Sequence, residues 1–274
     1  MGISNTNHEI LKQIQSIFGG NIYKRRLVKL KNNKGYCKQS FVWEIEADKS
    51  LIFLNGIKAS SIVKNKQITL GIEYRNNIKM CNGRKGLSTE EKEKRKTFID
   101  GMKKINHCSH EEHIGNTFLD SNNLTENLLQ YIAGFFDAEG CVYIHKSNFM
   151  LRIIIGQTNK DVLNFIQNYF GGKIRKKTNI QQTDGYKRKQ SWTWELTSKN
   201  TTYFMECIKP YILEKKEQIE VAIKYQIHDL IMHTTTKLSV DEISTREKYR
   251  VKLVMLKRDN LNKELKYFEG LTHQ

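Results

Sequence analysis

SNTNHEILKQIQSIFGG, residues 4–20, returns later in this chain as GQTNKDVLNFIQNYFGG, residues 156–172. Gly171 matches Gly19, 152 positions earlier, and further on the spacing slips by one residue to 151. Three more pairs of stretches match in the same order: 39–50 with 190–201, 56–74 with 207–225, and 86–96 with 237–247. Similarity at a nearly constant spacing over most of a chain indicates a repeat. The sequence therefore predicts a tandem duplication of one folded unit.

The second copy shows the order of its elements most clearly. From Asn159, an expected N-cap, up to Gly171, an expected stop, apolar residues recur at helical spacing. Residues 190–198 alternate around two tryptophans as a strand does, and residues 219–231 return to helical spacing. Two short β-rich runs within residues 141–159 precede these elements. Each copy is therefore expected to be an α+β half-domain.

One further segment combines an apolar helix with acidic residues. YIAGFFDAEGCV, residues 131–142, places Gly134 and Ala138 four positions apart and so on one helical face, where small residues allow close approach of another helix. Asp137 and Glu139 stand at the carboxyl end, where the helix dipole disfavours negative charge. Acids in that place suggest a compensating cation or metal. The alternative is an ordinary amphipathic helix that ends at the next glycine.

The composition points to a polyanionic partner. Lys and Arg number 46 against 29 acidic residues, a formal net charge of +17. The five cysteines are odd in number and form no C-x-x-C pair, which argues against a disulfide framework or a zinc ribbon and favours a reducing compartment. No stretch reaches the roughly 18–20 apolar residues of a membrane span. HCSHEEH, residues 107–113, lacks the H-E-x-x-H spacing, so it is interpreted as a linker and not as a metal site.

The motif segment resembles a known family. IAGFFDAEG, residues 132–140, is similar to the nine-residue LAGLIDADG motif of homing endonucleases, with Glu139 in place of the second Asp. The repeat also resembles the αββαββα half-domain of that family over roughly residues 1–260. The resemblance implies two half-domains that form a saddle, with antiparallel sheets in the DNA major groove. It also implies that the motif helices pack together, here through Ile132, Gly134, Phe135 and Ala138.

The resemblance also implies catalytic roles. Glu139 would bind Mg²⁺, a cation that prefers oxygen ligands, at the scissile phosphate. Gln157, whose counterpart in the first copy is Asn5, would position a water molecule. Lys215 and its counterpart Lys64 would stabilise developing charge, although Lys215 could also be a solvated residue of the charged run EKKE.

The DNA-facing side chains are predicted from strand alternation. In GKIRKKTN, the cations at 173, 175 and 177 share one strand face and Ile174 takes the other. Such cations can reach phosphates and base edges, and the alternative is a merely soluble sheet face. The predicted set is Tyr143, His145, Ser147, Arg152, Lys173, Arg175, Lys177 and Arg188 in the second copy, with Tyr23, Arg25 and Lys29 in the first.

The first copy is expected to lack its motif helix and first strand, since the repeat spacing places that motif before residue 1. The domains are then 1–106 for the first repeat, 107–125 for a linker, 126–260 for a complete second repeat, and 261–274 for a tail. An unpartnered motif helix would expose Ile132, Phe135 and Phe136 as an apolar patch. A longer product with an upstream segment is the favoured explanation. Pairing with a second copy through the intact motif, or a decayed gene product unable to cut, are the alternatives.

The leading functional hypothesis is a site-specific, Mg²⁺-dependent homing endonuclease encoded in a group I intron and acting on a long double-stranded DNA site. The alternative is an RNA maturase of the same fold, which binds intron RNA and assists splicing. A third hypothesis, a structural protein of a ribonucleoprotein, is supported by the net charge alone. The abundance of Asn, Lys and Ile, often a sign of an AT-rich gene, leads us to expect an organelle-encoded protein of a mitochondrion or chloroplast.

Overall fold

The computed structural model divides the chain into two compact units, which are treated separately. Unit 1 is Met1–Glu112 and unit 2 is His113–Gln274. The structure describes residues 1–27, 39–78, 86–107, 124–177, 190–197, 200–232 and 238–269, with side chains described as far as residue 257. Within these ranges no helix is both long enough and apolar enough to cross a membrane.

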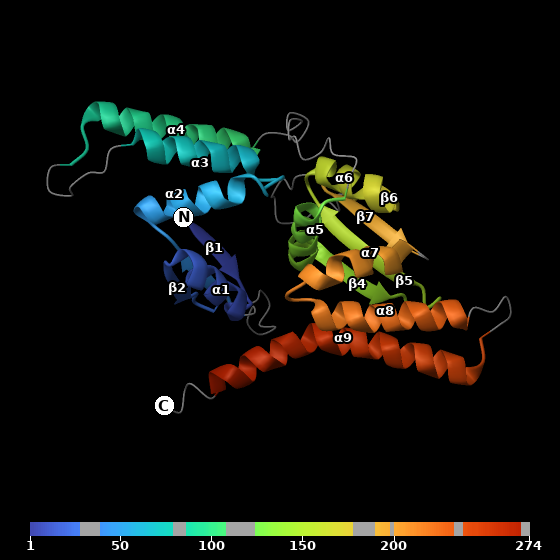
Figure 1. Cartoon of the computed structure of the whole chain (residues 1–274). Coiled ribbons are helices and arrows are strands. Elements are labelled where there is room, and N and C mark those ends of the chain that lie inside the picture. The colour runs from blue at the N-terminus through green and yellow to red at the C-terminus, as the bar shows by residue number, and fades with distance from the viewer. Residues whose placement is uncertain are drawn as a thin grey trace, which may run out of the picture. The chain divides into compact units, whose positions relative to one another are not determined.

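Unit 2 is built on a four-stranded antiparallel sheet (Figure 1). Its elements are α5 (Glu126–Glu139), β4 (Gly140–Ile144), β5 (Leu151–Gln157), α6 (Lys160–Phe170), β6 (Lys173–Lys176), β7 (Trp192–Thr197), α7 (Asn200–Ile208), the 3₁₀ turn η4 (Lys209–Tyr211), α8 (Lys216–Ile231) and α9 (Val240–Glu269). The strand order is β4-β5-β7-β6. The predicted α+β class and the αββαββα order of this copy are confirmed. Helix α9 continues into the segment expected to be a tail, since residues 261–269 are rich in helix-forming Leu, Lys and Glu.

Unit 1 repeats most of this plan with a three-stranded antiparallel sheet. Its elements are β1 (Gly2–Asn5), α1 (His8–Phe18), β2 (Asn21–Lys24), β3 (Phe41–Glu44), α2 (Ala47–Lys58), α3 (Asn65–Asn77) and α4 (Thr89–His107). The strand order is β1-β3-β2, so β1 corresponds to β5, β2 to β6 and β3 to β7. Among the described residues of unit 1, none forms a counterpart of α5 or β4.

The two copies share a glycine–tryptophan arrangement that fixes the turn after their first common helix. Gly20 and Gly172 have φ of 88° and 89°, a region that favours glycine. A Cβ on Gly172 would lie 2.6 Å from the carbonyl oxygen of Glu195, so no larger residue fits. Beside this turn, Trp43 Nε1 donates to the Gly19 carbonyl at 2.7 Å, and Trp194 Nε1 donates to the Gly171 carbonyl at 2.8 Å. The same sequence signal therefore produces the same local structure twice.

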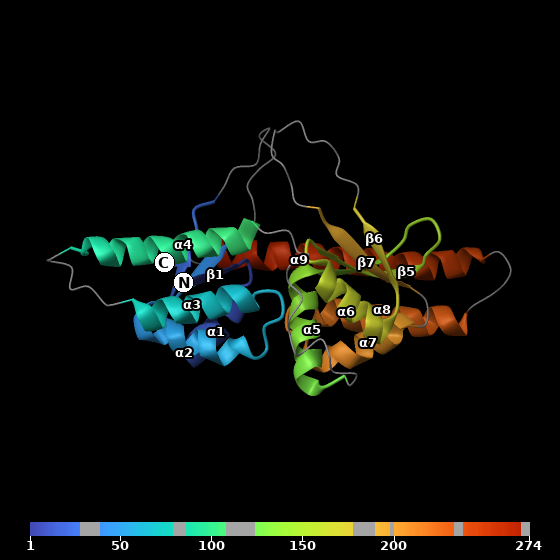
Figure 2. The same ribbon diagram turned by 90° about the horizontal axis from the view of Figure 1, so that it is seen from above.

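The helices of unit 2 cover one face of its sheet and leave the other face to polar residues. Helices α6 and α7 pack on β5 and β7, and Figure 2 shows both on the same side of these strands. Alternate residues of β5 and β7, such as Ile153, Ile155 and Trp194, point into this core and are fully buried. Phe204 of α7 meets the ring of Trp194 at 5.3 Å between centroids.

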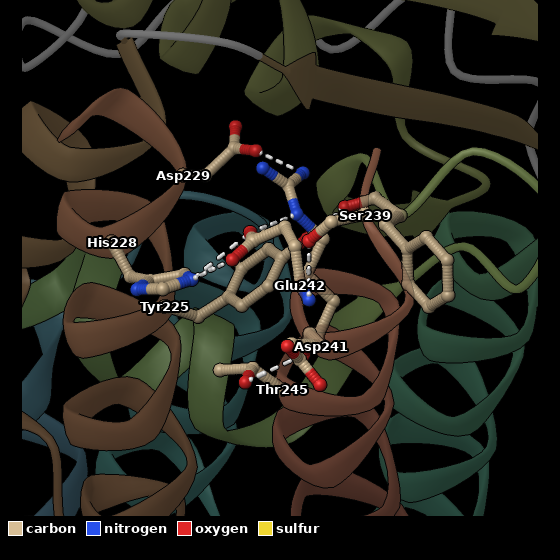
Figure 3. Close-up of polar contacts among 9 residues, drawn as sticks. Tyr225, His228, Asp229, Ser239, Asp241, Glu242 and Thr245 are labelled. Carbon is tan, nitrogen blue, oxygen red and sulfur yellow. Dashed lines mark hydrogen bonds and ion pairs between the residues drawn. The ribbon is translucent and has the colours of Figure 1, made fainter. Parts of the chain in front are cut away.

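A buried ionic cluster joins α8 to α9 (Figure 3). Arg246 donates through Nε to Glu242 at 2.6 Å and pairs through Nη1 with Asp229, while His228 Nε2 lies 3.0 Å from Glu242 Oε1. Burial alone would raise the pKa of Glu242, but the hydrogen bonds from Arg246 and His228 hold that pKa below its usual range. Burial raises the pKa of Tyr225 to about 12, so its hydroxyl stays protonated.

Candidate active site and nucleic-acid interface

The last turn of α5 is tied to the loop before α8 through Asp137. This side chain is 8% exposed, and its two carboxylate oxygens accept the backbone N–H groups of Leu213 at 2.7 Å, Glu214 at 3.1 Å and Lys215 at 3.0 Å. Lys215 Nζ also donates to the carbonyl oxygen of Asp137. The charge of Asp137 is thus compensated by backbone amides and a lysine, and its oxygens are already in use.

Glu139 differs from Asp137 in being exposed to solvent. It is the last residue of α5, and Gly140 follows as the C-cap and first residue of β4. A Cβ on Gly140 would lie 2.2 Å from the ring of Phe136, so only glycine allows the chain to turn into the sheet here. The motif therefore presents one buried acid that holds the fold and one accessible acid that can meet a ligand.

Lys215 lies beside this acidic helix end. Burial lowers the pKa of its ammonium group, and the nearby carboxylates of Glu214, Asp137 and Glu139 act in the opposite direction. The side chain is half-buried and directed at the Asp137 carbonyl, which differs from the solvated lysine considered as an alternative. Lys64 of unit 1 is exposed, and its φ and ψ of −106° and 11° match the −99° and 19° of Lys215.

Gln157 lies at the same end of the sheet as Glu139, because Gly140 pairs with Ile155 and Gln157 is the last residue of β5. Its Oε1 accepts from the backbone N–H of Thr158 at 2.7 Å. Asn5 ends β1 in the same way, and its Oδ1 accepts from the Asn7 N–H at 2.9 Å. Both predicted water-positioning residues therefore stand at strand ends with their carbonyl oxygens held locally.

The helix-free face of the unit 2 sheet carries the side chains predicted to face DNA. Tyr143, Arg152 and Thr197 are aligned across β4, β5 and β7, and Arg175 on β6 is aligned with Thr193. Lys173, Arg175 and Lys177 are exposed while Ile174 is half-buried, as the alternation predicts. The structure thus gathers these cations on one face.

Glu195 of β7 stands among these cations and was missed at the sequence level. Its Oε1 accepts from Arg152 Nη1 at 2.7 Å, and Arg175 Nε lies 3.4 Å from its Oε2. The Glu195 side chain is 14% exposed, against 67% for Arg175. The alternation of WTWELT already placed Glu195 on the Arg152 face, so the strand register could have revealed this pair.

The β4 edge of this face receives a lysine from α9, again unpredicted. Lys257 Nζ lies 3.1 Å from Cys141 Sγ and 5.9 Å from the centre of the Tyr143 ring. Beyond β4, His145 Nδ1 lies 3.0 Å from Ser147 Oγ in the β4–β5 turn, where Phe149 has φ 53°. This edge of the open face is therefore cationic as well.

In unit 1 the corresponding strand exposes Tyr23 and Arg25. The Arg25 N–H donates to Ser40 at 2.9 Å and the Arg25 carbonyl accepts from Gln39 Nε2 at 2.7 Å, as Lys177 bonds with Ser191 and Gln190 in unit 2. Two predicted residues, Lys29 and Arg188, lie outside the described residues, as does most of the HCSHEEH segment.

The predicted interface role of Ile132 needs correction. Ile132 and Phe136 are fully buried, because α5 packs its apolar side on α7, β4 and β5 of its own unit. The expected apolar patch is therefore not formed by these two residues. The surface of α5 that remains exposed carries Gly134 and Ala138, and the half-buried Phe135 ring stacks on Tyr131 at 6.0 Å between centroids.

Comparison with known proteins agrees with this geometry. Residues 126–209 match the family model of a LAGLIDADG-like domain, and no curated protein sequence matches the chain. The chain is similar to the LAGLIDADG meganuclease I-AabMI bound to uncleaved DNA, with a TM-score of 0.57 and 15% identity over 91% of this chain and 88% of that one. It is also similar to the LAGLIDADG homing endonuclease I-GzeII in complex with its DNA target, with a TM-score of 0.56 and 14% identity over 91% and 85%. At these identities the likeness to solved structures is one of fold. Residues 126–209 thus match a LAGLIDADG-like domain, and the chain as a whole shares the fold of these two LAGLIDADG endonucleases.

Proposed function

We propose that this protein is a site-specific DNA endonuclease in which Glu139 is the acid required for cleavage. The observation that carries the proposal is the different exposure of the two acids at the end of α5. Asp137 is buried and saturated by three backbone amides, whereas Glu139 is exposed beside Lys215. An accessible carboxylate next to an ammonium group suits a reaction at a phosphate.

The residues at this helix end fit a divalent cation that the substrate helps to hold. No group of three or more ligating side chains occurs among the described residues, so the protein there offers no closed cage. Mg²⁺ commonly binds one or two carboxylates together with phosphate oxygens and water, and Glu139 supplies such a carboxylate. When bound, the ion would offset negative charge developing at the scissile phosphate. Lys215, held on the Asp137 carbonyl, keeps a positive charge close to the same place.

The basic face of the unit 2 sheet supports binding of double-stranded DNA. Arg175, Lys173 and Lys177 are exposed on it, and the whole chain has a formal net charge of +17. Cations on phosphates supply much of the affinity, and side chains on base edges supply the specificity. Origin in a group I intron and an organellar location remain predictions from the sequence.

Cleavage by the purified chain is the direct test. The substrate is a plasmid that carries the host gene without the intron expected to encode this protein. It is incubated with Mg²⁺ or with EDTA. We expect linear product with Mg²⁺, and its loss in Glu139→Gln. Glu206→Gln removes an exposed acid on α7 and serves as the matched control.

DNA binding is measured separately by fluorescence anisotropy with Ca²⁺ in place of Mg²⁺. Glu139→Gln should bind the site within about twofold of the wild type, because Glu139 would reach phosphate only through the metal ion and the cations of the sheet face supply most of the affinity. Equal cutting by wild type and Glu139→Gln would refute the proposed role of Glu139. An uncut plasmid at full occupancy would refute the nuclease function of this chain. If the uncut plasmid were accompanied by equal intron splicing with the wild type and with Glu139→Gln, the RNA maturase hypothesis would replace the endonuclease hypothesis.

A further inference from the structure

The β4–β5 turn of unit 2, residues 145–150, contains a strained residue. Among the described residues, Phe149 is the only one other than glycine with a positive φ, at 53°. This left-handed region is unfavourable for a residue with a Cβ, and such a conformation persists only where surrounding contacts impose it. Within the turn, the Phe149 N–H donates to the His145 carbonyl at 2.9 Å, and the Met150 N–H donates to Asn148 Oδ1 at 3.2 Å. Neither bond involves the Phe149 carbonyl, so its direction is fixed by a contact from outside the turn.

That contact comes from Tyr225 of α8, which is 76 residues away in the chain. The Tyr225 hydroxyl donates to the Phe149 carbonyl. Tyr225 is 0% exposed, and burial raises its pKa to about 12, so the hydroxyl keeps the proton that it donates. A buried tyrosine hydroxyl usually has a hydrogen-bond partner, and here the partner belongs to the strained residue. Tyr225 therefore ties the β4–β5 turn to α8.

The ionic cluster between α8 and α9 holds Tyr225 in turn (Figure 3). Burial dominates the Tyr225 pKa, and the Arg246 guanidinium opposes the rise through its charge and a hydrogen bond. Arg246 is itself fixed by Glu242 at 2.6 Å and by Asp229. The Tyr225 ring also meets the ring of Tyr249 of α9 at 5.5 Å between centroids. The packing of α8 on α9 therefore determines where the hydroxyl points and where it holds the turn.

The turn presents polar side chains at one end of the basic sheet face. Lys146, Ser147 and Asn148 are exposed, and Ser147 Oγ lies 3.0 Å from His145 Nδ1. A serine hydroxyl can donate to a base edge or accept from it, so this pair of side chains suits the recognition of bases. A rotation of the Phe149 peptide would move both side chains, because all three residues belong to one turn.

The turn is distant from the acid proposed for cleavage. Strand β4 runs from Gly140, next to Glu139, to Ile144. At about 3.3 Å per residue, His145 therefore lies about 17 Å along the strand from Gly140. In B-DNA about five base pairs span this distance. A change in the turn should therefore alter the recognition of outer base pairs and leave the chemical step unchanged.

We propose that Tyr225 is a positioning residue for DNA recognition. Through the Phe149 carbonyl it holds the β4–β5 turn in the conformation that brings His145 and Ser147 to base edges. Base preference at this end of the target thus depends on a buried hydroxyl that does not itself touch DNA. The inference rests on the proposed function only in that the sheet face of unit 2 binds DNA.

The test measures base discrimination, which is the ratio of Kd for an altered site to Kd for the original site. The probe is a labelled duplex of the host gene around the expected intron position, with each base pair changed in turn, and binding is followed by fluorescence anisotropy with Ca²⁺. Ser147→Ala identifies the base pairs read by the turn, since discrimination there should fall about fivefold. Tyr225→Phe, which removes only the hydroxyl, should lose discrimination at the same base pairs. Tyr203→Phe removes a hydroxyl of α7 at a side chain 57% exposed and should change none of them.

A double variant separates positioning from a general loss of stability. Ser147→Ala combined with Tyr225→Phe should lose no more discrimination than either variant alone, because both act on one contact. Phe149→Pro cannot adopt a φ of 53° and should cause the same loss, which tests the inference even if Tyr225→Phe fails to fold.

Three results would overturn the proposal. Ser147→Ala could leave every base preference unchanged, Tyr225→Phe and Phe149→Pro could keep the discrimination that Ser147→Ala loses, or both could weaken binding to all sites by one factor. Because no cleavage is measured, a chain that shows the coupling but cuts no plasmid would refute the proposed function alone. A chain that cuts the plasmid without the coupling would refute this inference alone.

Discussion

Replacing Asp137 by alanine removes the acceptor that ties α5 to the start of α8. Three backbone N–H groups, at 2.7, 3.1 and 3.0 Å from its oxygens, lose their partner in this partly buried place. The Lys215 ammonium group loses the nearby charge of the Asp137 carboxylate but keeps its hydrogen bond to the backbone carbonyl of residue 137. Among the described residues no neighbouring carboxylate is hydrogen-bonded to the same amides, so no other side chain replaces Asp137 as their acceptor.

Hydrogen bonds to a charged acceptor contribute about 1.5–3 kcal/mol each, and donors left unsatisfied cost about 1–3 kcal/mol each. Water reaches some of these donors, so the sum is not fully realised, and we expect Asp137→Ala to lower the free energy of unfolding of unit 2 by about 3–5 kcal/mol. With a urea dependence of about 2 kcal/mol per molar, the midpoint falls by about 2 M. Glu139→Ala, at an exposed position two residues away, should change it by no more than about 0.5 kcal/mol.

The assay is pulsed hydrogen exchange along a urea series, read by mass spectrometry. Peptides from residues 151–170 report on unit 2, and peptides from residues 8–24 report on unit 1 and serve as the internal reference. A midpoint for residues 151–170 that moves no further in Asp137→Ala than in Glu139→Ala would refute the assignment of Asp137 as a structural acid.

Three other changes test the interface, the turn and the ionic cluster. Glu195→Gln removes the carboxylate that pairs with Arg152 and Arg175, which leaves both side chains able to contact phosphates. DNA affinity measured by fluorescence anisotropy should then rise about threefold to tenfold, and the slope of log Kd against log salt concentration should steepen by about one unit. Unchanged affinity and slope would contradict this prediction. Gly172→Ala, at φ 89° and with no room for a Cβ, should lower the unfolding temperature of unit 2 by roughly 6–12 °C in calorimetry, whereas Gly156→Ala in open space should have little effect. Because the folded-state pKa of Glu242 is lowered, its stabilisation is present near neutral pH and lost as pH falls through that pKa. The difference in unfolding temperature between wild type and Glu242→Gln should therefore shrink from about pH 7 to about pH 3, and a constant difference would exclude the charge of Glu242 as its cause.

Local features of the sequence predicted most of the elements correctly. The helix that starts after Asn159 ends at Gly171, and Asn159 Oδ1 accepts from the Asp161 N–H at 2.9 Å as an N-cap does. Caps, glycine stops and apolar spacing act over a few residues, so one sequence is enough to read them. The repeat then transferred each assignment from unit 2 to unit 1.

Long-range contacts explain what could not be predicted. The loop that binds Asp137 is 76–78 residues away in the chain, and Glu195 is 43 residues from Arg152. No periodicity encodes such pairs, although strand alternation did indicate the shared face. Ile132 was misplaced because α5 has apolar residues on more than one side, and only packing decides which side enters the core.

The different surroundings of the two acids of α5 predict different evolutionary constraints on them. If loss of Asp137 destabilises unit 2 as predicted, selection would remove that loss through protein degradation whether or not DNA is cut. Glu139 has no such protection, because its exposed carboxylate is not needed for folding. Under the proposed function, a single substitution at position 139 would therefore abolish cleavage while the protein still folds and binds DNA. On the same proposal, an Asp at position 137 in a related protein would indicate only the shared fold, and the residue at position 139 would indicate whether that protein can cleave.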